Sequence, residues 1–390
     1  MTSICMYFEV HQPVRINKFS VFSKTDEPYK DYFDWANNKR YLDRITYKCY
    51  LPTNNLLLDL IKKHDIKLTY SITGVFLEQC QKYHPEVIDS FKALIDTGNV
   101  EILDETYYHS LASLFSEDEF KEQVQKCRDL KKELLGCTSQ VFRNTEALYS
   151  NHIAGMVSRM GYKGILAEGS EKVLGWRSPN YVYNAQGSDL RLLLRNYKLS
   201  DDVSFRFSNH SWEEHPLTAD KYAYWLSTNP GQTINLFMDY ETFGEHQWES
   251  TGIFDFMRHL PEQVARHEHL EFKTASETIE SYEPVDNVDV PWAMSWADVD
   301  RDLSAWLGNS MQVDCFERMK KLEKPVKESG DAELLHVWRL LQTSDHFYYL
   351  CTKWFADGDV HKYFNPNESP YDGFINYANI LTDLEKKVGQ

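Results

Sequence analysis

The sequence predicts an α/β barrel followed by a region of helices. Over about the first 280 residues, short apolar runs alternate with amphipathic stretches, which is the pattern of parallel strands joined by crossover helices. There are seven or eight such runs, enough to close a barrel. After Pro291 the strand-like runs disappear and helical spacing takes over.

The predicted strands follow in chain order. They are Ile4–Val10, Ile66–Ile72, Val100–Leu103, Gln140–Arg143, Gly164–Ala167, Leu190–Arg195, Ile234–Asp239 and Leu270–Lys273. Among the helices between them, the one after the third strand has clear ends: Ser116 and Glu119 form a capping-box pattern, and Gly136 is placed to end the helix.

Two breaks in this alternation predict the domain organisation. From about residue 168 to residue 218 Gly, Pro, Asn and Ser accumulate, which indicates an excursion from the barrel. A second break, rich in Asp, Val and Pro, begins at Glu283. We therefore expect a barrel over residues 1–282 and a C-terminal helical region over residues 283–390.

Three helices are expected in the C-terminal region. Asn309 with Gln312 predicts a capped helix that Pro325 ends near Glu323. Helical spacing continues throughout Ala332–Phe355, and a last helix is expected over Asp372–Lys387.

Composition excludes several classes of function. The net charge of −17, without a basic stripe, argues against nucleic acid and anionic membrane partners. No apolar run approaches the roughly 18 residues of a membrane-spanning helix. The N-terminus has no basic region of the kind that opens a signal peptide, so we expect a cytoplasmic protein. The sequence makes no prediction of the oligomeric state.

Metal and cofactor motifs are absent from the sequence. The seven cysteines contain no CxxC pair, and no two histidines are spaced as HxxxH or HExxH. Phosphate-loop, GxGxxG and GxSxG motifs are also missing. We expect reduced thiols, no metal and no cofactor. The excess of aromatic residues, 24 Tyr, 21 Phe and 10 Trp, suits a core first, but it also suits stacking on sugar rings.

Polar residues follow several predicted strands where the functional groups of a barrel lie. Glu146 follows the fourth strand and Asp239 ends the seventh, so both carboxylates are expected at one mouth. Glycoside hydrolysis requires two such carboxylates about 5 to 9.5 Å apart. The alternative is that each is an exposed loop residue or an ion-pair partner, of Arg143 in the case of Glu146.

Five segments together resemble a known family. They occur in order as His11-Gln12-Pro13, Gly98-Asn99-Val100-Glu101, Arg143-Asn144-Thr145-Glu146, Asp239-Tyr240-Glu241-Thr242-Phe243-Gly244 and the segment from Trp296 to Trp306. This order is similar to the five motifs of glycoside hydrolase family 57. The segment from Gln342 to Tyr349 also looks like the α-amylase-type members. The resemblance therefore covers nearly the whole chain.

The resemblance implies an incomplete (β/α)7 barrel and a C-terminal helical bundle that completes the cleft. It implies action on α-glucans with retention of configuration and without a metal. By the family pattern Glu146 is the nucleophile and Asp239 is the acid/base, whose pKa should be raised by burial or by its anionic neighbour.

The resemblance also suggests substrate-binding residues. His11 and Glu101 match positions that hydrogen-bond the sugar in the central subsite, or else they support the barrel mouth. His109, His246 and Trp248 stand just beyond their motifs and either line a subsite or pack beneath it.

Three further candidates lie near the junction of the barrel and the helical region. Trp296 and Trp306 are stacking platforms or part of the domain interface. Asp298 is suited to sugar hydroxyls or to an ion pair with Arg301.

The leading hypothesis is a retaining, α-amylase-like hydrolase of α-1,4-glucans, with glycogen, starch or maltooligosaccharides as substrates. A 4-α-glucanotransferase of the same family is the nearest alternative. A non-catalytic α-glucan-binding protein and a metal-dependent polysaccharide deacetylase are alternatives from other classes, and the missing HxxxH pair opposes the deacetylase.

Overall fold

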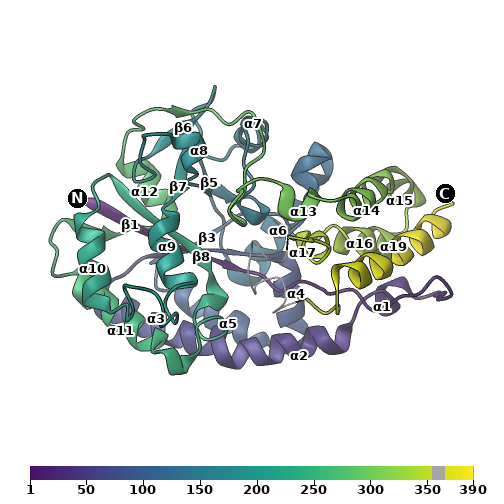
Figure 1. The fold of residues 1–390 in the computed structure, drawn as a ribbon, viewed down its shortest axis with the longest axis horizontal. Coiled ribbons are helices and arrows are strands. Elements are labelled where there is room, and N and C mark those ends of the chain that lie inside the picture. Colours follow the sequence, from purple (N-terminus) through teal and green to yellow (C-terminus); the bar gives the residue numbers. More distant parts are fainter. Residues whose placement is uncertain (354–364, 390) are drawn as a thin grey trace.

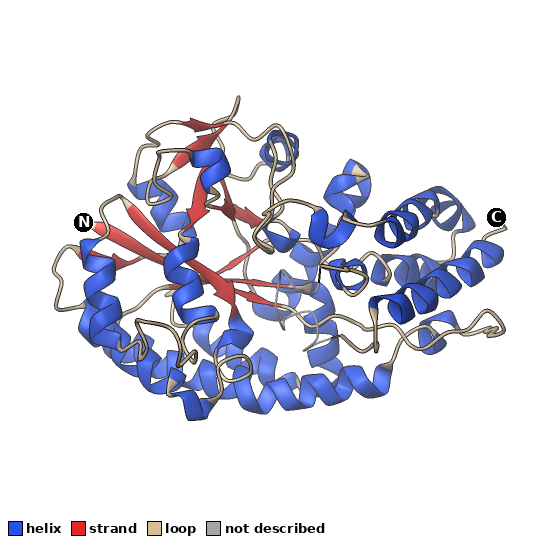
Figure 2. Cartoon of the chain, in the orientation of Figure 1, coloured by secondary structure: helices blue, strands red, loops and turns tan. Residues whose placement is uncertain are grey.

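A computed structural model describes residues 1–353 and 365–389. The strands gather in one half of the molecule, and the last helices form the other half (Figure 1; Figure 2). The N-terminal strand runs through the middle of the strand-rich half, whereas the C-terminus lies at the far end of the helical half. The architecture is α/β, an incomplete barrel followed by helices, as the sequence predicts.

Two sheets make up the barrel. The first has the order β3-β2-β1-β8, with β9 also paired to β1. Its strands are β1 (Thr2–Val10), β2 (Leu68–Ile72), β3 (Val100–Leu103), β8 (Thr233–Asp239) and β9 (Leu270–Phe272). All of these pairings are parallel, so the carboxyl ends of β1, β2, β3 and β8 meet at one end of the barrel.

The second sheet has the order β10-β6-β7-β5-β4. Its strands are β4 (Val141–Arg143), β5 (Gly164–Glu168), β6 (Tyr183–Ala185), β7 (Arg191–Arg195) and β10 (Asn287–Val288). A parallel bridge from Asp104 to Phe142 joins it to the first sheet after β3. On the other side, the backbone N–H of Asn196 donates to the carbonyl of Asn235 on β8 at 2.8 Å.

All eight strands predicted from the sequence are present. Strands β6 and β10 were not predicted; they are short and pair with each other at the edge of the second sheet. Because β6 lies within the excursion and β10 lies beyond residue 283, this pairing ties the two together. The boundary between residues 282 and 283 stays a prediction.

Helices surround the barrel and connect its strands (Figure 1). The α-helices are α1 (Pro28–Asp31), α2 (Trp35–Ile45), α3 (Leu51–His64), α4 (Gly74–Tyr83), α5 (Pro85–Ile95), α6 (Glu117–Leu135), α7 (Asn151–Arg159), α8 (Glu171–Leu174), α9 (Tyr197–Ser204), α10 (Ala219–Thr228), α11 (Ile253–Val264) and α12 (Ala275–Ser281). Short turns of other helix types are η1 (Thr46–Tyr50), η2 (Ala112–Leu114), η3 (Thr145–Ala147), η4 (Tyr240–Thr242) and η5 (Glu249–Thr251).

The predicted ends of α6 are confirmed. The Ser116 side chain accepts a hydrogen bond from the N–H of Glu119, and Gly136 ends the helix with φ 70°. That left-handed conformation is the one for which glycine carries no Cβ penalty.

The C-terminal region contains α13 (Ser304–Leu307), α14 (Ser310–Lys321), α15 (Glu323–Ser329), α16 (Ala332–Leu340), α17 (Ser344–Tyr348) and α19 (Pro370–Lys387). The capping box of Asn309 and Gln312 is confirmed. Helix α14 ends at Lys321, close to the end predicted near Glu323, but Pro325 does not end it, because the next helix, α15, already begins at Glu323. Pro325 lies in the first turn of α15, where a missing backbone N–H costs nothing.

The continuous helix expected over Ala332–Phe355 is wrong. The chain leaves the helix after Leu340 and begins another at Ser344, while Phe355 lies outside the described residues. The break has a tertiary cause, because Thr343 forms an isolated bridge with Ser110 of the barrel and its hydroxyl donates to the carbonyl of Tyr108 at 2.9 Å.

The barrel interior is filled by side chains from strands of both sheets. Tyr7, Leu103, Leu166 and Phe237 belong to this buried cluster, as does Ile279 of α12. A Cβ on Gly164, at the amino end of β5, would lie 2.9 Å from Ile279. Thus α12 closes the amino end of the barrel, and the carboxyl end is left for function. In the part of the chain that the structure describes, every helix is too short or too polar to cross a membrane.

Candidate active site

A cavity of about 540 Å³ lies at the carboxyl end of the barrel. That volume is within the usual range of a small-molecule site. Side chains reach it from the ends of β1, β7 and β8, from η3 and α9, from the loop over residues 296–301 and from α17. The cavity is therefore built by the barrel together with the C-terminal helical region.

Glu146 reaches the cavity from η3, directly after β4. Its backbone is left-handed, with φ 57°, and Ala147 follows with φ 49°. Such conformations are uncommon for residues with a Cβ and concentrate at functional sites. The strained turn makes the carboxyl group of Glu146 available at the cavity rather than within the strand layer.

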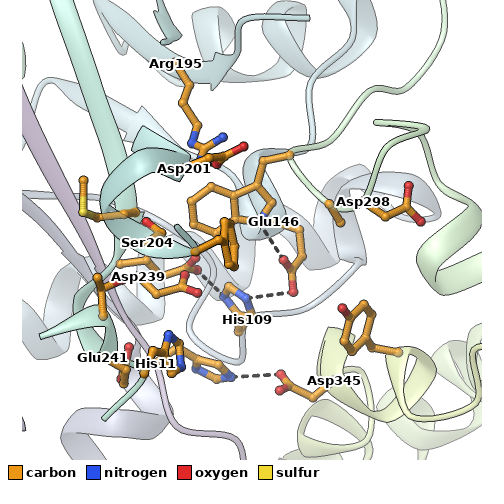
Figure 3. Close-up of a pocket in the computed structure, with 18 of the residues that line it drawn as sticks. His11, His109, Glu146, Arg195, Asp201, Ser204, Asp239, Glu241, Asp298 and Asp345 are labelled. Carbon is orange, nitrogen blue, oxygen red and sulfur yellow. Dashed lines mark hydrogen bonds and ion pairs between the residues drawn. The ribbon is translucent and has the colours of Figure 1, made fainter. Parts of the chain in front are cut away.

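Both oxygens of Glu146 accept hydrogen bonds. Oε2 accepts from Nε1 of Trp296 at 3.0 Å, and Oε1 accepts from the hydroxyl of Ser344 at 2.9 Å. Nε2 of His109 lies 3.4 Å from Oε1 (Figure 3). Burial alone would raise the pKa of Glu146, but the hydrogen bond and the charge of His109 outweigh it and lower that pKa. Glu146 is thus held as a carboxylate.

Asp239 ends β8 and faces the same cavity (Figure 3). Burial, and after it the negative charge of Glu146, raise the pKa of Asp239 to about 6. The cations Arg143, Arg195 and His109 act in the opposite direction without cancelling this effect. Two carboxyl groups in one cavity are therefore biased towards opposite protonation states, which is the usual arrangement of a base or nucleophile beside an acid.

The turn after Asp239 depends on Gly244. Its φ is 106°, and a Cβ there would lie 1.9 Å from the carbonyl oxygen of Lys48. Within this turn Glu241 is buried, lines the cavity and accepts a hydrogen bond from the hydroxyl of Tyr50 at 2.5 Å. Burial is the main cause that raises the pKa of Glu241 to about 8, so this carboxyl group is largely protonated at neutral pH.

A buried ion network lies beneath the two carboxyl groups. Arg143 donates to both oxygens of Glu9, to Oε2 at 2.6 Å, which answers the alternative that Arg143 pairs with Glu146. Nδ1 of His109 lies 3.3 Å from Glu9 and 3.4 Å from Glu105. Burial opposes protonation of His109, but Glu9, Glu105 and Glu146 raise its pKa well above the usual value.

The same network contains the one group of potential metal ligands found among the described residues. Glu9, Glu105 and His109 each place one ligand atom within 4.8 Å of the others. Arg143 already engages both oxygens of Glu9, and a protonated imidazole offers no lone pair to a metal. The donor set therefore fits an ion network better than a cation.

His11 links the barrel to the C-terminal helices. Its Nε2 lies 3.2 Å from Oδ2 of Asp345 on α17, and Nδ1 lies 2.9 Å from the hydroxyl of Thr73. The ring stacks on His109 with a centroid distance of 4.1 Å (Figure 3). Although burial opposes it, the hydrogen bond with His11 holds the pKa of Asp345 well below its usual range.

Most residues that the sequence singled out do meet at this cavity. They are His11, His109, Glu146, Asp239, His246, Trp296 and Asp298. Burial lowers the pKa of His246 to about 4, so its ring is neutral. Trp296 has the guanidinium carbon of Arg143 at 4.5 Å from one ring centroid, besides its hydrogen bond to Glu146. Asp298 also lies 3.7 Å from the ammonium group of Lys353.

Three of the residues proposed to bind substrate are not among the described residues that line the cavity. Glu101 is paired with Thr69, two residues before the carboxyl end of β3, and its carboxylate accepts from the backbone N–H of Ser276 at 2.8 Å. It therefore caps α12 at the opposite end of the barrel.

The two other residues are tryptophans. Trp306 is fully buried and packs near Tyr348, with ring centroids 6.3 Å apart, so it belongs to the core of the C-terminal region. Trp248 is 54% exposed and has the ammonium group of Lys48 at 5.4 Å from its ring. Neither indole is placed to stack on a sugar in the cavity.

Several residues of the site were not predicted from the sequence. Glu9, Arg195, Asp201, Glu241 and Asp345 line the cavity, and Ser344 contacts Glu146. Arg195, at the end of β7, binds Asp201 at 2.5 Å and Glu168 at 3.2 Å. Glu9 and Arg195 lie at the ends of predicted strands, so their positions could have identified them as residues of the site. Ser344 and Asp345 lie in the segment noted for its resemblance, but no strand end pointed to them.

Known proteins are similar to this chain in sequence. The family model described as glycosyl hydrolase family 57 matches residues 5–291. A protein of Methanocaldococcus jannaschii named "Putative alpha-amylase" is 48% identical over 393 residues, which is 98% of this chain and 84% of that protein.

Solved structures share the fold at low sequence identity. The 4-alpha-glucanotransferase from Thermococcus litoralis matches with a TM-score of 0.72 and 14% identity, over 99% of this chain and 60% of that chain. A GH57 branching enzyme from Thermococcus kodakaraensis matches with a TM-score of 0.70 and 13% identity, over 100% of this chain and 94% of that chain.

The family model covers most of the chain, and the 48% identical relative extends the match over nearly all of it. The chain belongs to glycosyl hydrolase family 57 and is a glycoside hydrolase.

Proposed function

We propose that this enzyme cleaves α-1,4-glucans with retention of configuration, with Glu146 as nucleophile and Asp239 as acid/base. The observation that carries the proposal is the opposite bias of the two carboxyl groups at one cavity. The pKa of Glu146 is lowered, chiefly by His109, which outweighs the effect of burial, whereas burial and the charge of Glu146 raise the pKa of Asp239 to about 6. A double displacement needs these two protonation states at its start.

In the first step the Glu146 carboxylate attacks the anomeric carbon. The bond to the leaving oxygen breaks, and that oxygen takes the proton of Asp239. The product is a β-glucosyl ester of Glu146. Consumption of the carboxylate charge of Glu146 removes one cause of the raised pKa of Asp239, so Asp239 stays ionised after giving up its proton and can act as the base of the second step.

In the second step Asp239 takes a proton from water, which attacks the anomeric carbon and releases Glu146. When a sugar hydroxyl takes the place of water, the same site transfers the glucosyl chain. Hydrolysis is the primary proposal, and 4-α-glucanotransferase activity is the alternative within one mechanism.

The test uses a single defined substrate, maltoheptaose, with products sized by mass spectrometry. Shorter products alone support hydrolysis, and products longer than the input support transfer. Proton NMR of the first product should show the α-anomer. Glu146→Ala is the control, and it should bind glucan without turning it over. An unchanged substrate in the presence of the parent enzyme, with binding retained, would favour a glucan-binding protein instead.

A further inference from the structure

Ser344 connects the C-terminal helical region to the proposed nucleophile. It is fully buried and is the first residue of α17. Its backbone N–H donates to the carbonyl of His109 at 2.9 Å, and its hydroxyl donates to Oε1 of Glu146 at 2.9 Å. The bridge between Thr343 and Ser110 holds the preceding residue. The backbone of Ser344 is thus fixed on the barrel independently of its hydroxyl.

The two oxygens of Glu146 have different surroundings. Oε1 has the hydroxyl of Ser344 at 2.9 Å and Nε2 of His109 at 3.4 Å, whereas Oε2 has the indole N–H of Trp296 at 3.0 Å. When a carboxylate attacks carbon, one oxygen gives up a lone pair to the new bond and the other becomes the carbonyl of the ester. Oε1, with two donors, suits the carbonyl, and Oε2 suits the attack.

We propose that Ser344 is a positioning residue for Glu146, and that its hydroxyl promotes release of the carboxylate from the glycosyl ester in the second step. This inference rests on the proposed function of Glu146 as nucleophile. In the first step the bond from C1 to Oε2 forms while the bond from C1 to the glycosidic oxygen breaks. In the second step the electron pair of the bond from C1 to Oε2 returns to Glu146 as water attacks C1.

The direction of the effect follows from hydrogen-bond strength. A charged carboxylate accepts a stronger hydrogen bond than the carbonyl of an ester. The donor from Ser344 therefore stabilises Glu146 more before attack and after release than in the ester between them. Removing the hydroxyl makes Glu146 a poorer leaving group, so the second step slows more than the first and the ester accumulates.

The test compares Ser344→Ala with Ser344→Thr on an aryl maltooligosaccharide, whose activated leaving group makes the first step fast. For Ser344→Ala we expect kcat to fall roughly tenfold to a hundredfold, as expected for one lost donor to a charged group. KM should fall with it, so kcat/KM changes little. A pre-steady-state burst of the aryl alcohol should grow, and Ser344→Thr, which keeps a hydroxyl, should restore much of kcat.

Ser110→Ala is the matched control. Ser110 is equally buried at the same contact between the barrel and the C-terminal region, but its hydroxyl donates to Gln123 at 2.6 Å. This variant should lose thermal stability without changing the burst or the ratio of kcat to KM. A folded Ser344→Ala enzyme with parental kcat, or one whose kcat/KM falls as much as kcat, would overturn the proposal.

A second readout does not depend on turnover. In uncomplexed protein labelled with ¹³C at the glutamate carboxyl, the resonance lost in Glu146→Gln identifies Glu146. Its pKa should be higher in Ser344→Ala than in the parent and unchanged in Ser110→Ala, because only the first variant removes a donor to the ionised form. An unshifted pKa would overturn the role of the hydroxyl. Absence of turnover by the parent enzyme would instead overturn the proposed function.

Discussion

Glu9 and Asp239 are register partners on the adjacent parallel strands β1 and β8. Carboxyl groups so placed, with Glu9 buried and Asp239 partly buried, cannot both carry an uncompensated charge at low cost. Arg143 donates to both oxygens of Glu9, and that pairing compensates its charge. Asp239 remains near the carboxylate of Glu146, and burial together with that charge raises the pKa of Asp239 to about 6.

Replacement of Glu9 should lower the pKa of Asp239 on the neighbouring strand. Glu9→Gln leaves the cation of Arg143 without its anionic partner and removes a neighbouring negative charge. Both changes favour ionised Asp239 and lower its pKa, so the alkaline limb of kcat/KM should move about one pH unit lower. The variant should also lose about 3–5 kcal/mol of unfolding free energy, measured in urea.

Glu119→Gln separates the two effects of the Glu9 variant. Glu119 is a buried carboxylate that accepts from Arg339 at 2.7 Å and 3.0 Å and is not among the described residues that line the cavity. It should lose comparable stability and keep the parental pH profile. An equal shift of the alkaline limb in both variants would show that the shift reports general destabilisation.

The pH dependence of the parent enzyme follows from Asp239. The first step requires protonated Asp239, and its pKa is raised to about 6 by burial and by Glu146. The rate constant kcat/KM should therefore fall as the pH rises through about 6, with a slope of one proton. Because the pKa of Glu146 is lowered, the acid limb should lie below the ordinary range of a glutamate. A kcat/KM that is flat from pH 5 to pH 8 would contradict this assignment.

The acid role of Asp239 depends on the leaving group. Asp239→Asn should reduce kcat/KM on maltoheptaose by roughly a hundredfold to ten-thousandfold, the usual contribution of a general acid. An aryl glycoside with a good leaving group needs less protonation, so the loss of kcat/KM on that substrate should be much smaller. Equal losses on both substrates would remove Asp239 from the role of acid.

Two tryptophans of one segment should respond differently to the same change. Trp296→Phe keeps a ring but removes the N–H that donates to Glu146, so kcat should fall roughly tenfold or more. Trp306→Phe alters a fully buried ring away from the cavity, so it should cost stability and leave kcat near the parental value. Steady-state kinetics with thermal melts of both variants make the comparison.

Most strands, and the positions of Glu146 and Asp239 at the barrel mouth, could be predicted because the signals for them are local in the sequence. Apolar runs mark buried strands, and in a parallel barrel a polar residue after such a run lies at the mouth. Glu101 does not lie at the mouth because of its position along β3. It is two residues before the end of the strand and faces α12. The depth of a residue along a short strand cannot be read from an apolar run.

Residues that reach the site only through tertiary contacts could not be predicted from the sequence. Ser344 reaches a carboxylate 198 positions away, and the helix break before it arises from the contact of Thr343 with Ser110 and Tyr108. Helical spacing alone predicted no break there. Likewise, Trp296 and Trp306 are the same residue type in one short segment of the chain. Only tertiary packing places the indole of Trp296 at the cavity and that of Trp306 in the core.

The order of the site along the chain has a consequence for biosynthesis. The last barrel strand ends at Val288, whereas the donors to Glu146 come from Trp296 and Ser344. A ribosome-bound chain that has completed its barrel already contains both proposed catalytic carboxyl groups, but the nucleophile is not yet oriented. We therefore expect the proposed catalytic site to become complete only after the residues of the barrel have been made.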